Sequence, residues 1–222
     1  MDNQTTIDNF RGELHEELTG NILPYWMKLR DTGYGGYYGR VTGKEELVRE
    51  APKGAVLQSR ILWTFSAAAR ILRNKEYLAY AAYAKDFLLG KMYDKEYGGI
   101  FWSVDHKGNI EDPRKQFYAL GFALYGLSEY HRATGDPVAL EKAVCLFGDI
   151  ENHSYDQIYG GYLEAAGRDW SEIRDLRLSA KDANEKKTMN THLHILEPYT
   201  NLFRIWKDPV LEQSLARLIE VF

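Results

Sequence analysis

"YDKEYGGIFW" at residues 93–102 and "YDQIYGGYLE" at residues 155–164 are two copies of one element, and "YGGY" at residues 34–37 begins a third. The tyrosines at positions 34, 97 and 159 are 63 and 62 residues apart. A Gly-Gly pair between aromatic residues suits a tight turn with positive φ, as in a short hairpin. A unit of this length exceeds the common solenoid repeats, so each repeat must hold more than one helix.

The segments between these turns read as pairs of helices. Residues 53–73 are apolar on most sides, which is typical of a helix covered on both flanks. Residues 75–92 form a more amphipathic second helix, which Asn74 can cap. In the next unit, Asp112–Pro113 is expected to open a helix that continues through residue 133.

Glycine and Asp-Pro signals delimit the later helices. Gly135 ends the helix before it, and Asp136–Pro137 opens a partner helix over residues 138–153. In the last unit a histidine-containing helix runs to about Trp206, and Asp208–Pro209 starts the final helix.

With an opening helix near residues 4–29, the chain is expected to hold seven helices. Each repeat places a turn before an inner helix, followed by an outer one. The sequence therefore predicts an all-α fold of the toroid type, an (α/α)6 barrel whose first helices this chain supplies. Residues 1–222 are expected to be the N-terminal part of a single barrel domain.

Composition narrows the class of protein. The chain has 222 residues with 45% hydrophobic content and a net charge of −4, without a basic block that would favour nucleic acid. No apolar run reaches the roughly 18 residues of a membrane span, and the N-terminus is too polar for a signal peptide. The single cysteine, Cys145, fits a reducing compartment, so we expect a cytoplasmic protein.

The segment after the third turn, residues 162–187, is the longest loop and is highly charged. It could be a solvated excursion or a lid over a cavity. The solvated excursion is favoured, because long loops are functional only in part of the cases.

Polar residues follow one face of the histidine helix. Asn190, His194, Glu197 and Asn201 are spaced i, i+4, i+7 and i+11 and share a face, whereas His192 points nearly opposite. Since the two histidines cannot share a ligand site, and no HExxH or cysteine cluster is present, a metal site is disfavoured. The face is either the wet side of a surface helix or the lining of a cavity. Because this helix follows a long turn, it is an inner helix, and His194 becomes a candidate acid or base.

Two more residues on inner helices are candidates for a site. Arg60 lies in mid-helix, where burial without a partner would be costly, so it either pairs with a carboxylate or faces ligand oxygens in the cavity. Tyr118 is ambiguous, since a core tyrosine is commoner than a ligand-binding one.

At these positions the chain resembles a known family. "QSRILWTFS" (58–66), "KQFYALGFALYG" (115–126) and above all "KKTMNTHLHILEPYTNLFR" (186–204) resemble the cellobiose 2-epimerases, within the wider N-acylglucosamine 2-epimerase superfamily. The resemblance covers essentially the whole chain. It implies an (α/α)6 barrel that interconverts glucose and mannose at the reducing end of β-1,4-linked disaccharides, without a metal or redox cofactor.

The resemblance also implies roles for single residues. Arg60 matches an arginine that contacts sugar oxygens near the reacting carbons, and Tyr118 matches a cavity tyrosine at the reducing-end sugar. Asn190 and His194 match the site-lining asparagine and second histidine of the NTHLH motif, which makes His194 the catalytic candidate in this chain. The two histidines that act as the acid/base pair come from later helices and have no counterpart here.

Several functions stay open. The leading expectation is C2 epimerisation of cellobiose, lactose or mannobiose, with N-acylglucosamine or mannose as alternative substrates on the same fold. From another class, a glycoside hydrolase or lyase would need two carboxylates roughly 5–10 Å apart across the cavity, and Glu197 has no evident partner. A non-catalytic sugar-binding remnant is the third possibility.

The final helix carries no stop signal. We therefore expect these residues to belong to a chain about twice as long, if the repeat continues around the ring. Expressed alone, they should associate or aggregate and lack activity, whereas the complete protein is expected to be a monomer or weak dimer.

Overall fold

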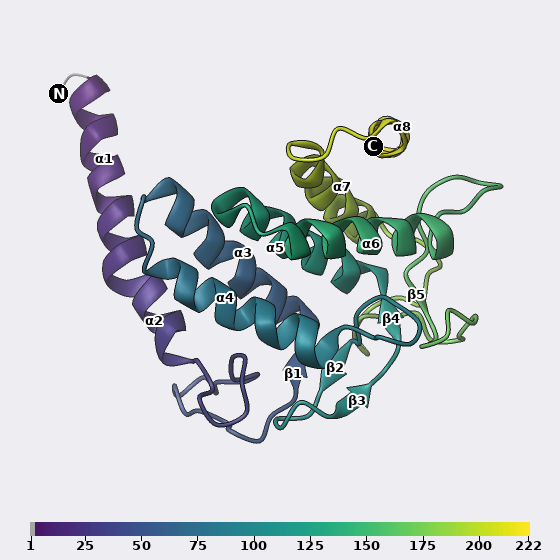
Figure 1. Cartoon of the computed structure of the whole chain (residues 1–222), viewed down its shortest axis with the longest axis horizontal. Helices are drawn as coiled ribbons and strands as arrows, with labels where there is room; N and C mark the ends of the chain where they lie inside the picture. The colour runs from purple at the N-terminus through teal and green to yellow at the C-terminus, as the bar shows by residue number, and fades with distance from the viewer. Residues whose placement is uncertain (1–2) are drawn as a thin grey trace.

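The computed structural model describes residues 3–222 as a set of stacked helix pairs (Figure 1). The helical segments are α1 (Asn3–Glu17), the π-helical turn η1 (Leu18–Ile22), α2 (Leu23–Lys28), α3 (Ala55–Ile71), α4 (Tyr77–Phe87), the π-helical turn η2 (Leu88–Met92), α5 (Phe117–Thr134), α6 (Pro137–His153), α7 (Met189–Phe203) and α8 (Pro209–Val221).

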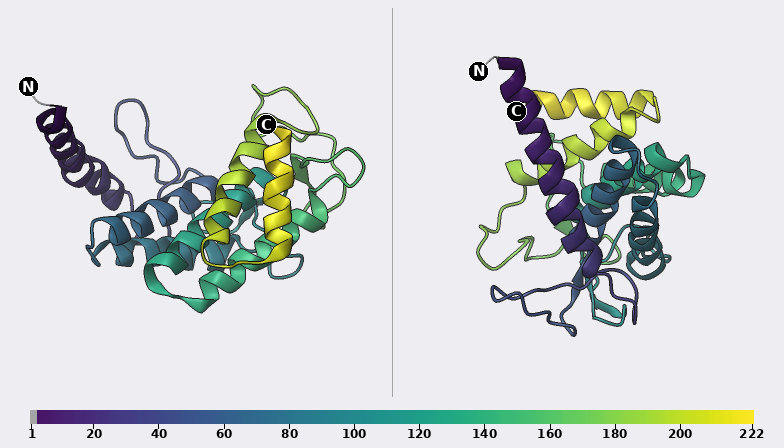
Figure 2. Two further views of the ribbon diagram at one scale, coloured as in Figure 1. Left: turned by 90° about the horizontal axis from the view of Figure 1, so that it is seen from above. Right: turned by 90° about the vertical axis from the view of Figure 1, so that its left-hand side faces the viewer.

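The expected alternation of inner and outer helices is confirmed. Helices α3, α5 and α7 pack side by side, while α4, α6 and α8 each pack against the inner helix that precedes them. The expected opening helix is the continuous run α1–η1–α2, and α1 stands away from the other helices at one end of the molecule (Figures 1 and 2). None of the helices over residues 3–222 combines the length and apolar character that crossing a membrane requires.

Most of the predicted helix ends are where the sequence signals place them. The carboxylates of Asp136 and Asp208 accept hydrogen bonds from the first backbone N–H groups of α6 and α8. Gly135 has a φ of 75° and ends α5 in the left-handed conformation. Asn74 does not cap α4 as expected: it accepts a hydrogen bond from Glu76 N in the preceding turn, and α4 begins at Tyr77 with Glu76 as its N-cap residue.

The expectation for Asp112 is wrong. It ends a short strand, and its carboxylate is bound by Arg114, so α5 begins only at Phe117. Residues 110–112 pair as a strand with residues 103–104, so the Asp-Pro pair does not start a helix.

Small antiparallel sheets join successive repeats. Strands β1 (Lys53–Gly54), β2 (Ser103–Val104) and β3 (Ile110–Asp112) form one sheet in the order β1-β2-β3, with Lys53 opposite Val104. Strands β4 (Lys115–Gln116) and β5 (Ala165–Ala166) form the other. Each sheet ties the start of an inner helix to the segment that follows the next Gly-Gly turn.

The three Gly-Gly turns have the predicted geometry. All six glycines have φ between 66° and 85°, which side chains other than glycine rarely adopt. An antiparallel bridge closes each turn as a short hairpin, joining Arg30 to Tyr37 in the first, Tyr93 to Ile100 in the second and Tyr155 to Tyr162 in the third.

A lysine–aspartate clip, defined here as the contacts of one lysine at the start of an inner helix with the preceding turn, recurs in every repeat. Lys53 binds Asp31 at 2.6 Å, Lys115 binds Asp94 at 3.0 Å, and Lys187 binds Asp156 at 2.6 Å. Each lysine also donates to the carbonyl of the first glycine of its turn. The clip therefore fixes every turn to the helix that follows it.

A second contact joins the first and the third Gly-Gly turns to the inner helices that follow them. Five residues after the clip lysine, Gln58 accepts a hydrogen bond from Tyr37 N at 3.0 Å, and His192 Nε2 accepts one from Tyr162 N at 2.9 Å. The other ring nitrogen of His192 donates to Thr188 O at 2.7 Å. Since one nitrogen must accept and the other must donate, His192 is held as a neutral imidazole. Its predicted position, pointing away from the polar face of α7, is confirmed.

The packing of the third turn predicts unequal costs for two neighbouring alanine substitutions. Gly160→Ala meets no atom within 4 Å, so it should cost only the positive-φ penalty of about 1–2 kcal/mol. Gly161→Ala would place Cβ 2.6 Å from His192 Nε2 and should cost about 1–3 kcal/mol more. Chemical denaturation of the full-length gene product would measure both. Equal costs would contradict the close contact with His192.

The second clip predicts a pH-dependent stability. Burial opposes ionisation of Asp94, but hydrogen bonds from Arg168, Lys115 and the Glu96 N–H outweigh it and lower the pKa of Asp94 below 3.8. Because the folded-state pKa is below the unfolded one, the ionised carboxylate adds stability above about pH 4 and loses it as the pH falls toward the folded-state pKa.

We expect Asp94→Asn to lower the free energy of unfolding by about 3–5 kcal/mol at pH 7, since Lys115 is fully buried, and by less at acidic pH. Denaturant titrations at pH 7 and at the lowest pH at which the protein is still folded would measure the difference. The exposed Asp86→Asn is the control, with an expected change within about 0.5 kcal/mol at both pH values.

Candidate active site

An open groove lies between the three inner helices, with a volume of about 320 Å³. This is within the usual size range of small-molecule sites. Its lining residues recur at helical spacing on each helix. They are Arg60, Trp63 and Thr64 from α3, Phe122 and Tyr125 from α5, and His194 and Glu197 from α7.

His194 is oriented by Glu197 one turn further along α7. The distance from His194 Nδ1 to Glu197 Oε2 is 2.8 Å, so Nδ1–H donates to the carboxylate. The imidazole Nε2 has no partner among residues 3–222 and remains free for a ligand in the groove. The ring is enclosed by Tyr118 and Phe122, at centroid distances of 4.9 and 4.8 Å.

Arg60 lies across the groove on the same aromatic surface. Its guanidinium carbon is 4.4 Å from the centre of the Phe122 ring. The sequence left open whether Arg60 pairs with a carboxylate or faces ligand oxygens; its side chain is exposed, and no carboxylate of the described residues forms an ion pair with it. The pairing alternative is therefore excluded within residues 3–222, and the donors of Arg60 are available to ligand oxygens.

Tyr118 joins this cluster from α5. Burial raises the pKa of its hydroxyl group, nearby Arg60 opposes the rise, and Glu197 adds to it. The phenol therefore stays protonated at neutral pH and can donate a hydrogen bond. Arg60, Tyr118 and His194, singled out from the sequence, are thus brought together.

The close approach of α5 and α7 sets the position of His194. A Cβ atom at Gly121 would lie 2.4 Å from His194 O and 3.6 Å from the Pro198 ring. Pro198 has no N–H, so the carbonyl of His194 lacks the usual helical hydrogen bond and faces α5 instead. Only glycine at position 121 allows this packing.

Asn190 occupies a different place from the other candidates. It is exposed and lines a second cavity, of about 160 Å³, on the first turn of α7, one helical turn before His194. The other walls of this cavity come from Glu164, Thr188 and the long loop, through Leu176, Arg177, Leu178, Asp182, Ala183 and Glu185. The structure thus puts Asn190 beside, not among, the residues around His194.

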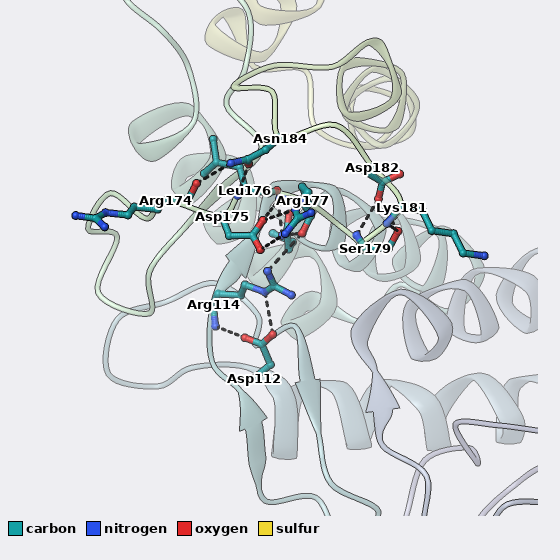
Figure 3. Close-up of polar contacts among 11 residues, drawn as sticks. Asp112, Arg114, Arg174, Asp175, Leu176, Arg177, Ser179, Lys181, Asp182 and Asn184 are labelled. Carbon is teal, nitrogen blue, oxygen red and sulfur yellow. Dashed lines mark hydrogen bonds and ion pairs between the residues drawn. The ribbon is translucent and has the colours of Figure 1, made fainter.

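The long loop is mostly exposed, as a solvated excursion would be, yet it is ordered by many polar contacts (Figure 3). Asn184 accepts a hydrogen bond from Leu176 N and donates one to Arg174 O, which closes the loop on itself. Since the loop also walls the cavity beside Asn190, it contributes to the candidate site.

The polar face predicted for α7 does not extend to Asn201. This residue is buried and bonds to Arg132 at 2.8 Å and to Ser128 at 2.9 Å, both on α5. It joins two inner helices, because the face of α7 turns toward α5 at its C-terminal end.

Sequence reasoning missed the aromatic walls of the groove. Trp63 and Tyr125 pack against each other at 5.3 Å, and Phe122 lies between Arg60 and His194. The signal was present, since Tyr118, Phe122 and Tyr125 are spaced i, i+4 and i+7 on one helix face.

The cluster suits recognition of a polyhydroxylated ring. A guanidinium, a phenol and an imidazole with a free nitrogen offer donors and an acceptor to hydroxyl groups, and the aromatic walls offer flat apolar surfaces. Within residues 3–222 no group of three or more histidine, cysteine or acidic side chains is arranged to hold a metal ion.

Comparison with known proteins agrees with this geometry. Residues 36–200 match the family model of N-acylglucosamine 2-epimerase (GlcNAc 2-epimerase). The chain is 59% identical over 211 residues to a cellobiose 2-epimerase of Bacteroides fragilis, covering 95% of this chain and 54% of that protein. A cellobiose 2-epimerase of Ruminococcus albus is 43% identical over 192 residues, covering 86% of this chain and 49% of that protein.

The structure of cellobiose 2-epimerase from Bacillus thermoamylovorans superposes with a TM-score of 0.93 at 42% identity, covering 97% of this chain and 55% of that one. This likeness assigns the helices to the (α/α)6-barrel fold. The chain spans about half the length of the curated relatives it matches. On the family model and the identities together, the chain belongs to the N-acylglucosamine 2-epimerase family.

Proposed function

We propose that the protein containing this chain epimerises the reducing-end sugar of β-1,4-linked disaccharides at C2, with cellobiose as a substrate. The observation that carries the proposal is the cluster of Arg60, Tyr118 and the His194–Glu197 pair around one groove. The 59% identity to a cellobiose 2-epimerase supports the choice of substrate over N-acylglucosamine or free mannose.

The chemistry of C2 inversion explains why such groups are needed. After the sugar ring opens, a base removes the C2 proton, and the electrons move to the aldehyde oxygen to give an enediolate, which becomes an enediol if that oxygen takes up a proton. Returning a proton to the opposite face of C2 inverts the centre. The reaction therefore needs a base on each side of a flat intermediate and hydrogen-bond donors at the oxygens that gain charge.

The groove residues suit the second requirement. Arg60 lies over Phe122, where its N–H groups can face the O1 and O2 atoms of a bound sugar. His194, oriented through Nδ1 by Glu197, presents Nε2 to the same sugar as a catalytic group that stabilises and orients the intermediate. Because one histidine cannot serve both faces, we place the two proton-transferring bases outside residues 1–222.

Asn190 and Tyr118 have supporting roles in this proposal. The protonated phenol of Tyr118 donates to a sugar hydroxyl beside His194. Asn190, in the second cavity, contacts the part of the substrate that extends beyond the reacting carbons. Two sugar rings need more length than one, and two cavities lined by residues one helical turn apart on α7 would offer it.

Product analysis of the full-length gene product tests the reaction. Incubation with cellobiose should yield glucosyl-mannose, resolved by chromatography and NMR. Release of free glucose would instead support a hydrolase. Conversion of N-acetylglucosamine but not of cellobiose would show that the protein is an N-acylglucosamine 2-epimerase. Binding of cellobiose without turnover would indicate a sugar-binding protein that has lost catalysis.

Single substitutions test the site residues. We expect His194→Ala and Arg60→Ala each to reduce kcat/KM by about 10²–10³, the usual cost of removing one donor at a charge-developing oxygen. His15→Ala, which removes an exposed histidine on α1, should leave kcat/KM unchanged. Circular dichroism and Tm would confirm that the fold is intact. Full activity of both site variants would mean that these residues serve only structure.

A further inference from the structure

Trp170 connects the long loop to the second Gly-Gly turn. Its indole Nε1 donates to Tyr97 O at 2.8 Å, and its ring stacks on His153 at 4.2 Å with an interplanar angle of 3°. The ring of Phe117, the first residue of α5, lies nearly parallel to it at 6.1 Å. Trp170 itself has a φ of 67°, a conformation that costs energy for any residue other than glycine.

Gly99 provides the space for this ring. A Cβ atom at Gly99 would lie 2.7 Å from Trp170 Cη2 and 3.2 Å from Cζ2. The equivalent glycines of the other turns face side chains of helices, Phe87 for Gly36 and His192 for Gly161. Only in the second turn does a tryptophan of the long loop lie against the second glycine, so this ring contact is specific to the repeat.

Arg168 reinforces the same connection. It binds Asp94 through two hydrogen bonds, from Nε at 2.9 Å and from Nη2 at 3.2 Å, and binds Glu96 at 2.8 Å. In the described part of the chain, Asp31 and Asp156 form ion pairs with their clip lysines only. Asp94 thus accepts both the clip of its own repeat and a second cation from the loop.

The far part of the loop is held by the start of α5. Gln116 is buried, and its Nε2 donates to Leu176 O at 3.3 Å and to Arg177 O at 3.0 Å. Figure 3 shows Arg114 lying between Asp112 and the loop near Arg177, whose carbonyl it contacts at 3.4 Å. The loop is therefore attached at Trp170 and again at Leu176 and Arg177. The stretch from Leu176 to Glu185 lines the cavity beside Asn190.

We propose that Trp170, seated on Gly99, is a positioning residue that holds residues 167–187 as a fixed wall for the sugar substrate. The inference rests on the proposed function, and it names the residue that holds the substrate-binding loop in position. Arg60, Tyr118 and His194 lie on helices and do not contact Trp170, so loss of the indole should weaken substrate binding and spare the chemical step.

A double-mutant cycle in the full-length protein tests this role. Trp170→Ala should raise KM for cellobiose about tenfold with kcat unchanged, because a displaced wall loses substrate contacts. Gly99→Ala should raise KM similarly by expelling the ring. The double variant should show no further rise, since both substitutions remove the same contact. Trp170→Phe, which keeps a ring on Gly99, should restore most of the affinity.

Two controls separate positioning from general stability. Gly160→Ala introduces the same positive-φ strain at the equivalent turn without a clash, and Trp206→Ala removes a tryptophan packed on Phe147. Both should lower Tm without changing KM. Amide hydrogen exchange gives a readout independent of catalysis, and residues 174–186 should exchange faster in Trp170→Ala than in either control.

Additive effects on KM, or an unchanged KM in Trp170→Ala, would overturn the proposal, as would unchanged exchange in the loop. A full-length protein that does not convert cellobiose would contradict the proposed function instead. In that case the same cycle is read from the Kd of cellobiose measured by calorimetry, and additive or absent effects on Kd would again overturn the role of Trp170.

Discussion

The ion pair between a turn aspartate and the lysine that precedes the next inner helix connects the two parts of every repeat. A lysine buried as completely as Lys53 or Lys115 is costly unless its charge and its donors are satisfied. Here a carboxylate and a glycine carbonyl satisfy them together, and the same carboxylate accepts backbone N–H groups of the turn. Turn geometry, sheet pairing and the start of the inner helix are thereby fixed at one point.

The two histidines of α7 show how this framework separates structure from chemistry. Two residues apart on a helix, they point in nearly opposite directions. His192 is directed at the third turn, where both ring nitrogens are engaged. His194 is directed at the groove, where Glu197 engages one nitrogen and the other is free. The rigid attachment of His192 to the turn helps to hold its neighbour in place.

The sequence predicted features that depend on local conformation. The Gly-Gly turns require positive φ, and the caps at Asp136 and Asp208 need only their own helix, so both were recognisable. The expectation for Asp112 was wrong because its segment pairs as a short strand with residues 103–104 of the same unit, a pairing that the Asp-Pro signal does not reveal. The exposure of Arg60 and the burial of Asn201 could not be assigned from helix periodicity, since the packing angles of three helices decide which residues face the open groove.

The clip lysines were missed for another reason. A single lysine before a helix looks like a surface residue, and its burial depends on a carboxylate 21 to 31 residues earlier. The signal was nevertheless in the repeat, because an aspartate stands three residues before the tyrosine of each turn and a lysine follows before each inner helix. Aligning the repeats with one another would have revealed the pair.

The clips also bear on how the chain reaches its native state. They close short loops, and the inner helices make their main contacts with their neighbours in the series. Low sequence separation keeps the entropy of loop closure small, and contacts mainly between neighbours allow structure to begin at any helix pair and spread along the chain. Among the three clips, the second gathers the most native partners, because Lys115 lies over two aromatic rings and its partner Asp94 also binds Arg168.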